Sequence, residues 1–195
     1  MAAPRQPSPL VLASSSPRRA ELLRESGYRF EVVPPGLQEP QDETLHVDAA
    51  AYAESLAYFK ARSVAGRHAA DTILAADTIS VSREGIFGKP ADRDDARRIL
   101  SRLAGSTHSV ITGVALLHPE TDQRMIEHEV SVIRMRPIDD DELEAYLDSG
   151  DWRGKAGAYG IQDHGDRFVE SYEGSLSNIV GLPMELVCRM FDGWK

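Results

Sequence analysis

The chain reads Leu10-Val11-Leu12-Ala13-Ser14-Ser15-Ser16-Pro17-Arg18-Arg19 near its N-terminus. The apolar run at residues 10–13 predicts a short buried strand. Pro17 suits the first position of a helix with Ser16 as its N-cap, and Gly27 suits the end of that helix. The segment therefore predicts a strand, a serine-rich loop and a helix in immediate succession, as in α/β folds.

Strand and helix patterns alternate along the rest of the chain. The expected strands are residues 28–33, 72–81, a short one within 83–89, 108–117, 124–136 and one near 167–172. The expected helices are residues 48–65, 92–103 and 139–148, and a last one that carries Leu186, Val187 and Met190. The polar turn at residues 118–122 predicts an antiparallel pair of long strands. We expect an α/β fold in a single domain, in one or two lobes, with a mixed central sheet flanked by helices and a cleft between the lobes.

The apolar positions of the helices predict which side chains are buried. In residues 92–103 they are Ala96, Ile99, Leu100 and Leu103, at helical spacing. In residues 48–65 they are Tyr52, Leu56, Phe59 and Val64, before a closing Gly66. Cys188 lies on a helix rich in Leu, Val and Met, so we expect it in the core rather than in a reactive site.

Length and composition favour a soluble globular protein. The chain has 195 residues, of which 42% are hydrophobic and 27% are charged. Residues 1–9 hold three prolines and no apolar h-region, so they predict a disordered extension rather than a secretory signal, ahead of a domain at residues 10–195. No apolar run approaches the ~18 residues that cross a bilayer, and one cysteine cannot form an internal disulfide. We expect a cytoplasmic protein with no membrane partner.

The net charge of −9 argues against a nucleic-acid polymer as the partner, because such binding needs a basic face. A small polyanion stays compatible with this charge, since a few local cations suffice. Only four of the 22 basic residues are lysines: Lys60, Lys89, Lys155 and Lys195. A lysine in an arginine-rich chain can mark a site that needs a compact ammonium, although chance also leaves a few surface lysines.

The serine loop is the first candidate site. A helix N-terminus offers unpaired N–H groups and a partial positive charge to a phosphate. Ser14 and Ser16 add hydroxyl donors, and Arg18 and Arg19 add guanidinium groups that can hold two phosphate oxygens. Ser-Pro before a helix is also ordinary capping, so both interpretations stay open.

Asp77 is the second candidate. An aspartate inside the apolar run Ala75-Ala76-Asp77-Thr78 is costly unless it is paired, hydrogen-bonded or bound to a metal. The short hairpin that ends in Gly88-Lys89-Pro90 could bring Lys89 back beside Asp77. A turn, or a pair with one arginine, is the alternative.

Residues 155–162 are the third candidate, because small residues admit a ligand close to the backbone and Gln162 can donate to and accept from a base edge. A flexible surface loop is the alternative there. Residues 174–183 form a further candidate, but a structural role as a turn that enters the last helix explains them equally well. The histidines show no metal-ligand spacing, whereas carboxylates such as Asp77 and Glu39 would suit Mg²⁺ or Mn²⁺.

Several motifs occur in a fixed order along the chain. They are Leu12-Ala13-Ser14-Ser15-Ser16-Pro17-Arg18-Arg19, Ala76-Asp77-Thr78, Gly88-Lys89-Pro90, His108-Ser109-Val110-Ile111-Thr112-Gly113-Val114, residues 155–162 and residues 178–183. The ordered set resembles the Maf (septum-formation-inhibitor) family of nucleoside triphosphate pyrophosphatases from about Leu10 to Phe191.

The resemblance implies a homodimeric α/β enzyme that uses a divalent cation, Mg²⁺ or Mn²⁺, to hydrolyse a nucleoside triphosphate to the monophosphate and pyrophosphate. It implies that Asp77 is the catalytic base and that Glu39 and Asp77 hold the metal. Gln38-Glu39 stands where the family usually has Asp-Glu, so the choice among Glu39, Asp42 and Glu43 stays open. The implied phosphate-binding residues are Ser14, Ser16, Arg18, Arg19, Lys60, Lys89 and Lys155.

Three further positions bear on the choice of base. Arg18, Thr78 and Gln162 resemble the dTTP/UTP branch of the family, which implies a pyrimidine nucleotide, modified uridines included. Two alternatives stay open: the same reaction on 7-methyl-GTP or another purine nucleotide, and a non-catalytic nucleotide-binding regulator of cell division.

Overall fold

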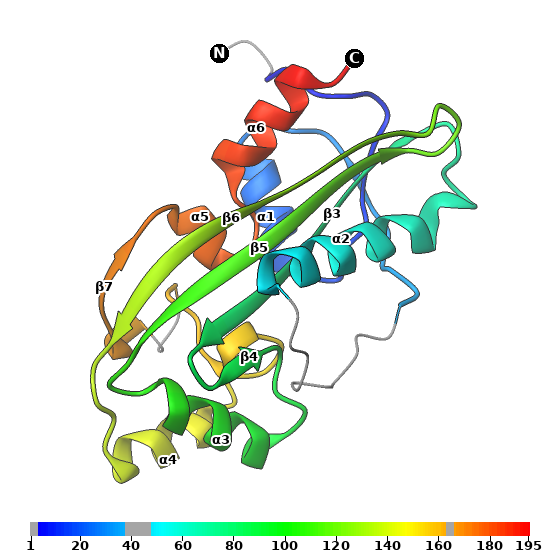
Figure 1. Cartoon of the computed structure of the whole chain (residues 1–195). Helices are drawn as coiled ribbons and strands as arrows, with labels where there is room; N and C mark the ends of the chain where they lie inside the picture. The colour runs from blue at the N-terminus through cyan, green and yellow to red at the C-terminus, as the bar shows by residue number, and fades with distance from the viewer. Residues whose placement is uncertain (1–3, 38–47, 163–165) are drawn as a thin grey trace.

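The structure is a computed structural model that describes residues 4–37, 48–162 and 166–195. Its strands form one seven-stranded sheet in the order β2-β1-β3-β5-β6-β7, with β4 pairing to β3 outside this order (Figure 1). The β1 strand is parallel to β2 and β3, and the other pairs are antiparallel, which confirms the predicted mixed sheet. The strands are β1 (Leu10–Leu12), β2 (Glu31–Val32), β3 (Thr72–Ser82), β4 (Gly85–Phe87), β5 (Thr107–His118), β6 (Gln123–Met135) and β7 (Val169–Glu173).

Helices cover both faces of the sheet (Figure 1). Helices α1 (Pro17–Glu25) and α6 (Met184–Gly193) pack on one face, and α2 (Ala49–Ala65) packs on the other. Because side chains alternate along a strand, β1 places Leu12 in the α1–α6 core and Val11 in the α2 core. No helix in these described ranges is long and apolar enough to cross a membrane.

A third core lies at one end of the sheet. It joins α3 (Arg93–Leu103), α4 (Asp140–Ser149) and the short β4 strand through side chains such as Ile99, Tyr146 and Phe87. The remaining elements are the 3-10 turns η1 (Ala156–Ala158) and η2 (Asp166–Phe168) and the short helix α5 (Leu176–Val180). The predicted loop at residues 174–183 therefore contains a helical turn, which Ser175 caps by accepting a hydrogen bond from the N–H of Asn178 (3.2 Å).

The bounds of β2 differ from expectation. The β2 strand has two residues, not the six predicted, because its partner β1 has only three residues and the backbone of Arg29 bonds the side chain of Gln6 instead. Helix α1 ends at Glu25, and Gly27 follows as the predicted stop, with a φ of +82°, the left-handed conformation that glycine adopts readily. The antiparallel pair β5–β6 is confirmed, with each strand within two residues of its predicted range.

The predicted apolar stripe of α2 is wrong at Phe59, which is 54% exposed. The side chains that α2 buries against the sheet are mostly small: Ala53, Leu56, Ala57, Ala61 and Val64. A helix backbone that lies close to a sheet leaves room for methyl groups and excludes an aromatic ring.

Cys188 is exposed, so the prediction that it lies in the core is wrong. Helix α6 turns Leu186, Val187 and Met190 inward, and position 188 falls at the margin of that face. The Cys188 sulfur lies 3.1 Å from the hydroxyl of the buried Tyr28. Burial and this contact raise the pKa of the Tyr28 hydroxyl, so Tyr28 stays neutral.

Part of the N-terminal segment contacts the domain. Gln6 donates through Nε2 to the carbonyl of Arg29 (2.7 Å) and accepts through Oε1 from the N–H of Arg29 (2.8 Å). Arg5 donates through Nη2 to the carbonyl of Trp194 (3.4 Å). Residues 1–3 lie outside the described residues.

Candidate active site

A gap in the sheet marks the site. One edge of β3 pairs with β5 from Ile73 to Val81. The other edge pairs with β1 as far as Leu74 and with β4 from Ser80 onward. Among the described residues, positions 75–79 therefore have no strand partner on that edge, and Asp77 and Thr78 lie in this interval. Ligands of α/β sheets bind in crevices where strands end and the sheet opens.

A cleft of about 630 Å³ lies beside this gap and is lined by Lys60, the ion-pair partner of Asp77. This volume lies within the ~300–1,000 Å³ of small-molecule sites. The serine loop lines one side and the turn after α4, with Gly150 and Asp151, lines the other. Every residue that the resemblance assigns to the phosphates lines this cleft: Ser14, Ser16, Arg18, Arg19, Lys60, Lys89 and Lys155. The hairpin brings Lys89 to this cleft, while the partner that the structure gives Asp77 is Lys60.

A smaller hollow of about 60 Å³ continues the cleft. The residues common to both are Ser16, Arg18, Arg19, Lys89, Gly154 and Lys155, so one ligand can occupy both. All three residues expected at the base, Arg18, Thr78 and Gln162, line this hollow. Tyr159 and Gly181 line it too, and sequence reasoning assigned no role to either.

Ser14 organises the serine loop. Its hydroxyl oxygen accepts hydrogen bonds from the N–H of Ser16 (3.1 Å) and from Nη1 of Arg19 (3.3 Å). Ser16 stands at the N-cap of α1, but its side chain makes no capping hydrogen bond within the described residues. Ordinary side-chain capping by Ser16 therefore does not explain the serine-rich sequence. The loop places the N-terminus of α1 at the cleft.

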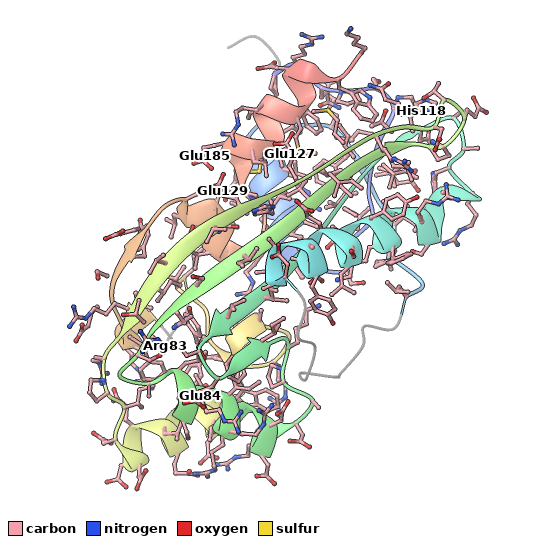
Figure 2. All side chains as sticks on the ribbon, in the orientation of Figure 1. Arg83, Glu84, His118, Glu127, Glu129 and Glu185 are labelled. Carbon is pink, nitrogen blue, oxygen red and sulfur yellow. The ribbon has the colours of Figure 1, made fainter. Side chains whose placement is uncertain are left out.

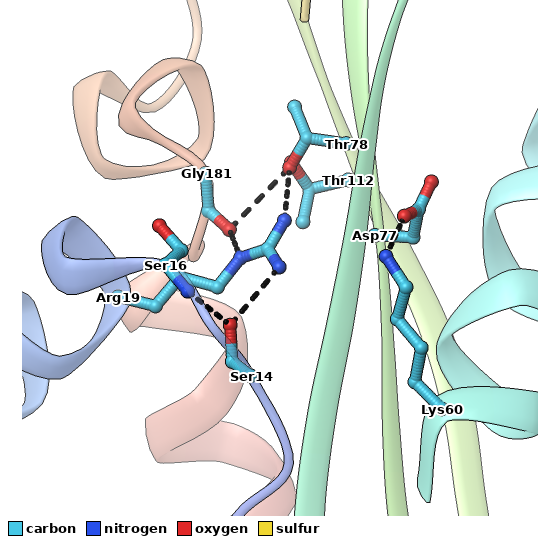
Figure 3. Close-up of polar contacts among 8 residues, drawn as sticks. All are labelled: Ser14, Ser16, Arg19, Lys60, Asp77, Thr78, Thr112 and Gly181. Carbon is cyan, nitrogen blue, oxygen red and sulfur yellow. Dashed lines mark hydrogen bonds and ion pairs between the residues drawn. The ribbon is translucent and has the colours of Figure 1, made fainter. Parts of the chain in front are cut away.

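Arg19 is a buried hub of hydrogen bonds rather than a surface cation (Figure 3). Its Nε donates to the carbonyl of Gly181 (2.7 Å) and its Nη2 donates to Oγ1 of Thr78 (3.0 Å). Oγ1 of Thr78 also lies 2.9 Å from Oγ1 of Thr112. Arg19 thus connects the serine loop, β3 and the turn after α5, and it holds Thr78 at the wall of the hollow.

Asp77 lies on the opposite face of β3 from Thr78, toward α2 (Figure 3). Its Oδ1 forms an ion pair with Nζ of Lys60, and both side chains are about 95% buried. The alternative of a pair with arginine is wrong, because the partner is Lys60. Asp77 lines neither the cleft nor the hollow, whereas Lys60 lines the cleft, so the Asp77 carboxylate stands behind a cation of the cleft. Removing one member of a buried pair leaves an uncompensated charge, so the two act as a unit.

Gly113 allows Lys60 to reach Asp77. In the sheet register, Gly113 of β5 is the partner of Asp77. A Cβ at position 113 would overlap the backbone carbonyl of Ala53 in α2. Helix α2 therefore lies on the sheet at backbone distance above Gly113, and Lys60, further along the helix, meets Asp77. The motif around Gly113 was visible in the sequence, but this role depends on the register between strands.

Of the two predicted metal ligands, Glu39 and Asp77, the structure describes Asp77. No cluster of three or more His, Cys, Asp or Glu side chains occurs in the described ranges. Glu39, predicted to hold a metal with Asp77, lies outside the described residues, as do Asp42 and Glu43. Among the described carboxylates, Asp77 is paired with the cleft cation Lys60 and Asp151 lines the cleft itself, and Mg²⁺ typically binds one or two carboxylates together with phosphates and water.

Three acidic surface residues lie away from the cleft, whereas Asp151 lines it. Figure 2 shows Glu127 and Glu129 on β6 and Glu185 on α6. Glu129 faces Arg189 at 3.5 Å, and none of the three glutamates lines the cleft or the hollow. The net charge of −9 is therefore not spread evenly, and the cleft is a local concentration of positive charge.

The motifs and the geometry agree with a family comparison. A family model described as "Maf-like protein" matches residues 9–194. The chain belongs to the Maf family. Among its relatives are two proteins named "dTTP/UTP pyrophosphatase". The protein from Ruminiclostridium cellulolyticum is 43% identical over 183 residues, covering 94% of each chain. The protein from Symbiobacterium thermophilum is 42% identical over 182 residues, covering 93% of this chain and 91% of the relative.

The Maf chain also shares its fold with a solved structure. A HAM1 protein from Coxiella burnetii superposes with a TM-score of 0.52 at 18% identity, and the match covers 95% of this chain and 98% of the other. The likeness extends the mixed α/β architecture of this Maf protein to a distant sequence.

Proposed function

We propose that this Maf protein hydrolyses dTTP, UTP or a modified pyrimidine nucleoside triphosphate to the monophosphate and pyrophosphate. The observation that carries the proposal is one cleft that collects Arg18, Lys60, Lys89 and Lys155 at a gap in the sheet, with the buried carboxylate of Asp77 behind Lys60. The names of the two bacterial relatives support the reaction and the pyrimidine preference.

Electrostatics favour a triphosphate in the cleft despite the net charge of −9. One cation about 4 Å from a phosphate oxygen contributes about 4 kcal/mol of attraction at an effective dielectric constant of about 20. Repulsion from surface carboxylates is screened over about 8 Å at physiological salt. Several cleft cations therefore outweigh the diffuse negative charge, and the distal phosphates lie among the lysines.

The hollow beside the cleft takes the base. Gln162 can both donate to and accept from a base edge, and Thr78 and Arg18 complete the wall. Arg19 fixes the hydroxyl of Thr78, so the wall is organised before the nucleotide binds. Organisation of this kind lowers the cost of ordering side chains on binding.

Asp77 is the base in this proposal. A water molecule attacks the α-phosphorus, its proton passes to the Asp77 carboxylate, and the bond from that phosphorus to the bridging oxygen breaks to release pyrophosphate. Lys60 stays beside the carboxylate and binds the phosphates from the same position. Lys89 and Lys155 stabilise the charge on the departing pyrophosphate.

A divalent cation, Mg²⁺ or Mn²⁺, fits the donor chemistry of the site, because hard oxygen ligands are available from Asp77 and from the phosphates. When bound, it would neutralise phosphate charge and lower the pKa of a water molecule. Asp77 would contribute one ligand, and Glu39 is the second ligand in this proposal. The family resemblance further supports a cytoplasmic location and a homodimer. Sedimentation would test the homodimer.

The test is a panel of triphosphates with Mg²⁺ or Mn²⁺, scored for pyrophosphate. The panel contains dTTP, UTP, 5-methyl-UTP, pseudo-UTP, GTP and 7-methyl-GTP. We expect the pyrimidine nucleotides to have the highest kcat/KM. Preference for 7-methyl-GTP would overturn the base assignment, and nucleotide binding without pyrophosphate release would overturn the enzymatic proposal.

A further inference from the structure

The loop that joins the phosphate and base sides of the site has an unusual backbone. It runs from Lys155, which lines the cleft, to Gln162, which lines the hollow. Within it Gly157 has a φ of +71° and Ala158 has a φ of +64°. For alanine this left-handed conformation costs about 1–2 kcal/mol. A strained conformation persists only where the surroundings determine it, so this loop needs anchors.

One anchor comes from the backbone. The N–H of Gly157 donates to the carbonyl of Gly88 (3.0 Å), next to Lys89. A Cβ at position 157 would lie 2.5 Å from Oγ of Ser80, which is a steric overlap, so a larger residue would separate the loop from β3. This anchor holds the Lys155 end of the loop against the Lys89 hairpin.

The second anchor is a buried side-chain pair. The hydroxyl of Tyr159 and Nε2 of His108 on β5 are hydrogen-bonded at 2.7 Å. Their rings meet edge to face, with centroids 5.6 Å apart. Both side chains are buried, yet Tyr159 also lines the hollow. His108 lines neither the hollow nor the cleft, so its effect on the site passes through Tyr159.

Stability alone does not account for an imidazole at position 108. Burial lowers the pKa of His108 to about 4, so the ring is neutral at neutral pH. Its Nδ1 is buried and has no hydrogen-bond partner in the described part of the chain. A buried polar atom without a partner costs free energy, which an apolar side chain of similar size would avoid. Within the described residues, the polar contact of the ring is the one to Tyr159.

We propose that His108 is a positioning residue for nucleotide binding: through the hydroxyl of Tyr159 it holds the loop of residues 155–162, and with it Lys155 and Gln162, against the nucleotide. This inference rests on the proposed function. It assigns His108 no contact with substrate and no part in proton transfer.

Four variants separate this role from a general effect on folding. Tyr159→Phe removes the hydroxyl and keeps the ring that lines the hollow. His108→Leu removes the imidazole nitrogens at similar volume. His108→Gln is the conservative variant, because an amide can reach the position of Nε2 and restore the hydrogen bond. Tyr28→Phe is the matched control, since it removes another buried tyrosine hydroxyl, hydrogen-bonded to Cys188 far from the site.

The readouts are kcat and KM for dTTP, and the Kd of the non-hydrolysable α,β-imido analogue of dUTP. We expect Tyr159→Phe and His108→Leu each to raise KM and Kd about 3- to 10-fold, the range that one hydrogen bond supplies, with kcat within about twofold. KM and Kd of the double variant should be no higher than those of the more impaired single variant, because both substitutions remove the same hydrogen bond. His108→Gln should recover most of the affinity, and Tyr28→Phe should match the wild type.

Hydrogen exchange gives a readout independent of turnover. Amides in residues 154–162 should exchange faster in Tyr159→Phe and His108→Leu, while those of β5 and β6 stay protected. Unchanged KM and Kd in these two variants would overturn the inference. A decrease in kcat alone would overturn it too, as would a His108→Gln variant whose KM and Kd were no lower than those of His108→Leu. If the wild type bound the analogue but released no pyrophosphate, the proposed function would fail while the exchange and Kd measurements still decided the role of His108.

Discussion

Asp77 and Thr78 are consecutive residues of β3 whose side chains bind cations on opposite faces of the sheet (Figure 3). Asp77 pairs with Lys60 of α2, and Thr78 accepts a hydrogen bond from Arg19 of α1. The alternation of a strand thus places the proposed base on one side of the gap and the wall of the base hollow on the other. Helix α1 supplies Arg18 and Arg19 to the cleft, and α2 supplies Lys60.

Arg19→Lys should weaken both the fold and nucleotide binding. A lysine cannot bond Ser14, Thr78 and Gly181 at once, because it lacks the planar guanidinium group. We expect a loss of about 1–3 kcal/mol in the free energy of unfolding, measured by urea denaturation, and a KM raised about tenfold. Arg62→Lys, on the exposed last turn of α2, is the control and should change neither quantity. A wild-type KM in Arg19→Lys would argue against the hub role.

Gly113→Ala should separate Lys60 from Asp77. The added methyl group meets the backbone of Ala53, so α2 must move away from the sheet. We expect a destabilisation of at least about 3 kcal/mol and little pyrophosphate release from the folded fraction. Gly66→Ala, where no atom lies within 4 Å of the added methyl, is the matched control and should be neutral or slightly stabilising. Full activity in a folded Gly113→Ala protein would show that the close approach of α2 is dispensable.

Stability should fall on mild acidification partly because of His108. Its pKa is 6.5 in an ordinary environment and about 4 in the fold. The unfolded chain therefore binds a proton first, and the stability present above pH 6.5 declines as the pH falls toward 4. This group contributes a loss of about 2 kcal/mol between pH 7 and pH 5. Urea denaturation at the two pH values gives the free energy of unfolding of each protein. The decrease from pH 7 to pH 5 should be smaller in His108→Leu than in the wild type by about that amount. Equal decreases in the two proteins would contradict the account.

Gln162→Glu should change base preference more than total binding. The amide both donates and accepts, whereas the carboxylate only accepts and adds negative charge at the base. We expect the ratio of kcat/KM for UTP to that for GTP to shift several-fold, while competitive inhibition by pyrophosphate stays within about twofold. The same relative rates on UTP, dTTP and GTP would place Gln162 outside base selection.

The sequence allowed prediction of features that depend on neighbouring residues. The serine loop, the Lys89 hairpin and the β5–β6 pair follow from local patterns, and the structure brings the predicted phosphate residues into one cleft. The burial of Phe59 and Cys188 was predicted wrongly, because helical periodicity indicates a face and not what covers its margins.

Contacts between distant segments could not be predicted from one sequence. The link from His108 to Tyr159 joins residues 51 positions apart. The contact of Gly113 with Ala53 requires both the sheet register and the placement of α2. Arg19 was expected to bind phosphate, and its partners Thr78 and Gly181 lie 59 and 162 positions further along the chain. Tertiary packing, rather than any local pattern, decides these contacts.

The most direct test compares pyrophosphate release from dTTP by the wild type and by Asp77→Asn, with Mg²⁺ present. Breaking the buried pair should lower stability yet leave a cooperatively folded protein, with turnover reduced at least about 100-fold. Asp192→Asn, on the exposed side of α6, controls for the loss of an acid group and should retain full turnover. Near-normal release by a folded Asp77→Asn protein would contradict the assignment of this carboxylate as the base.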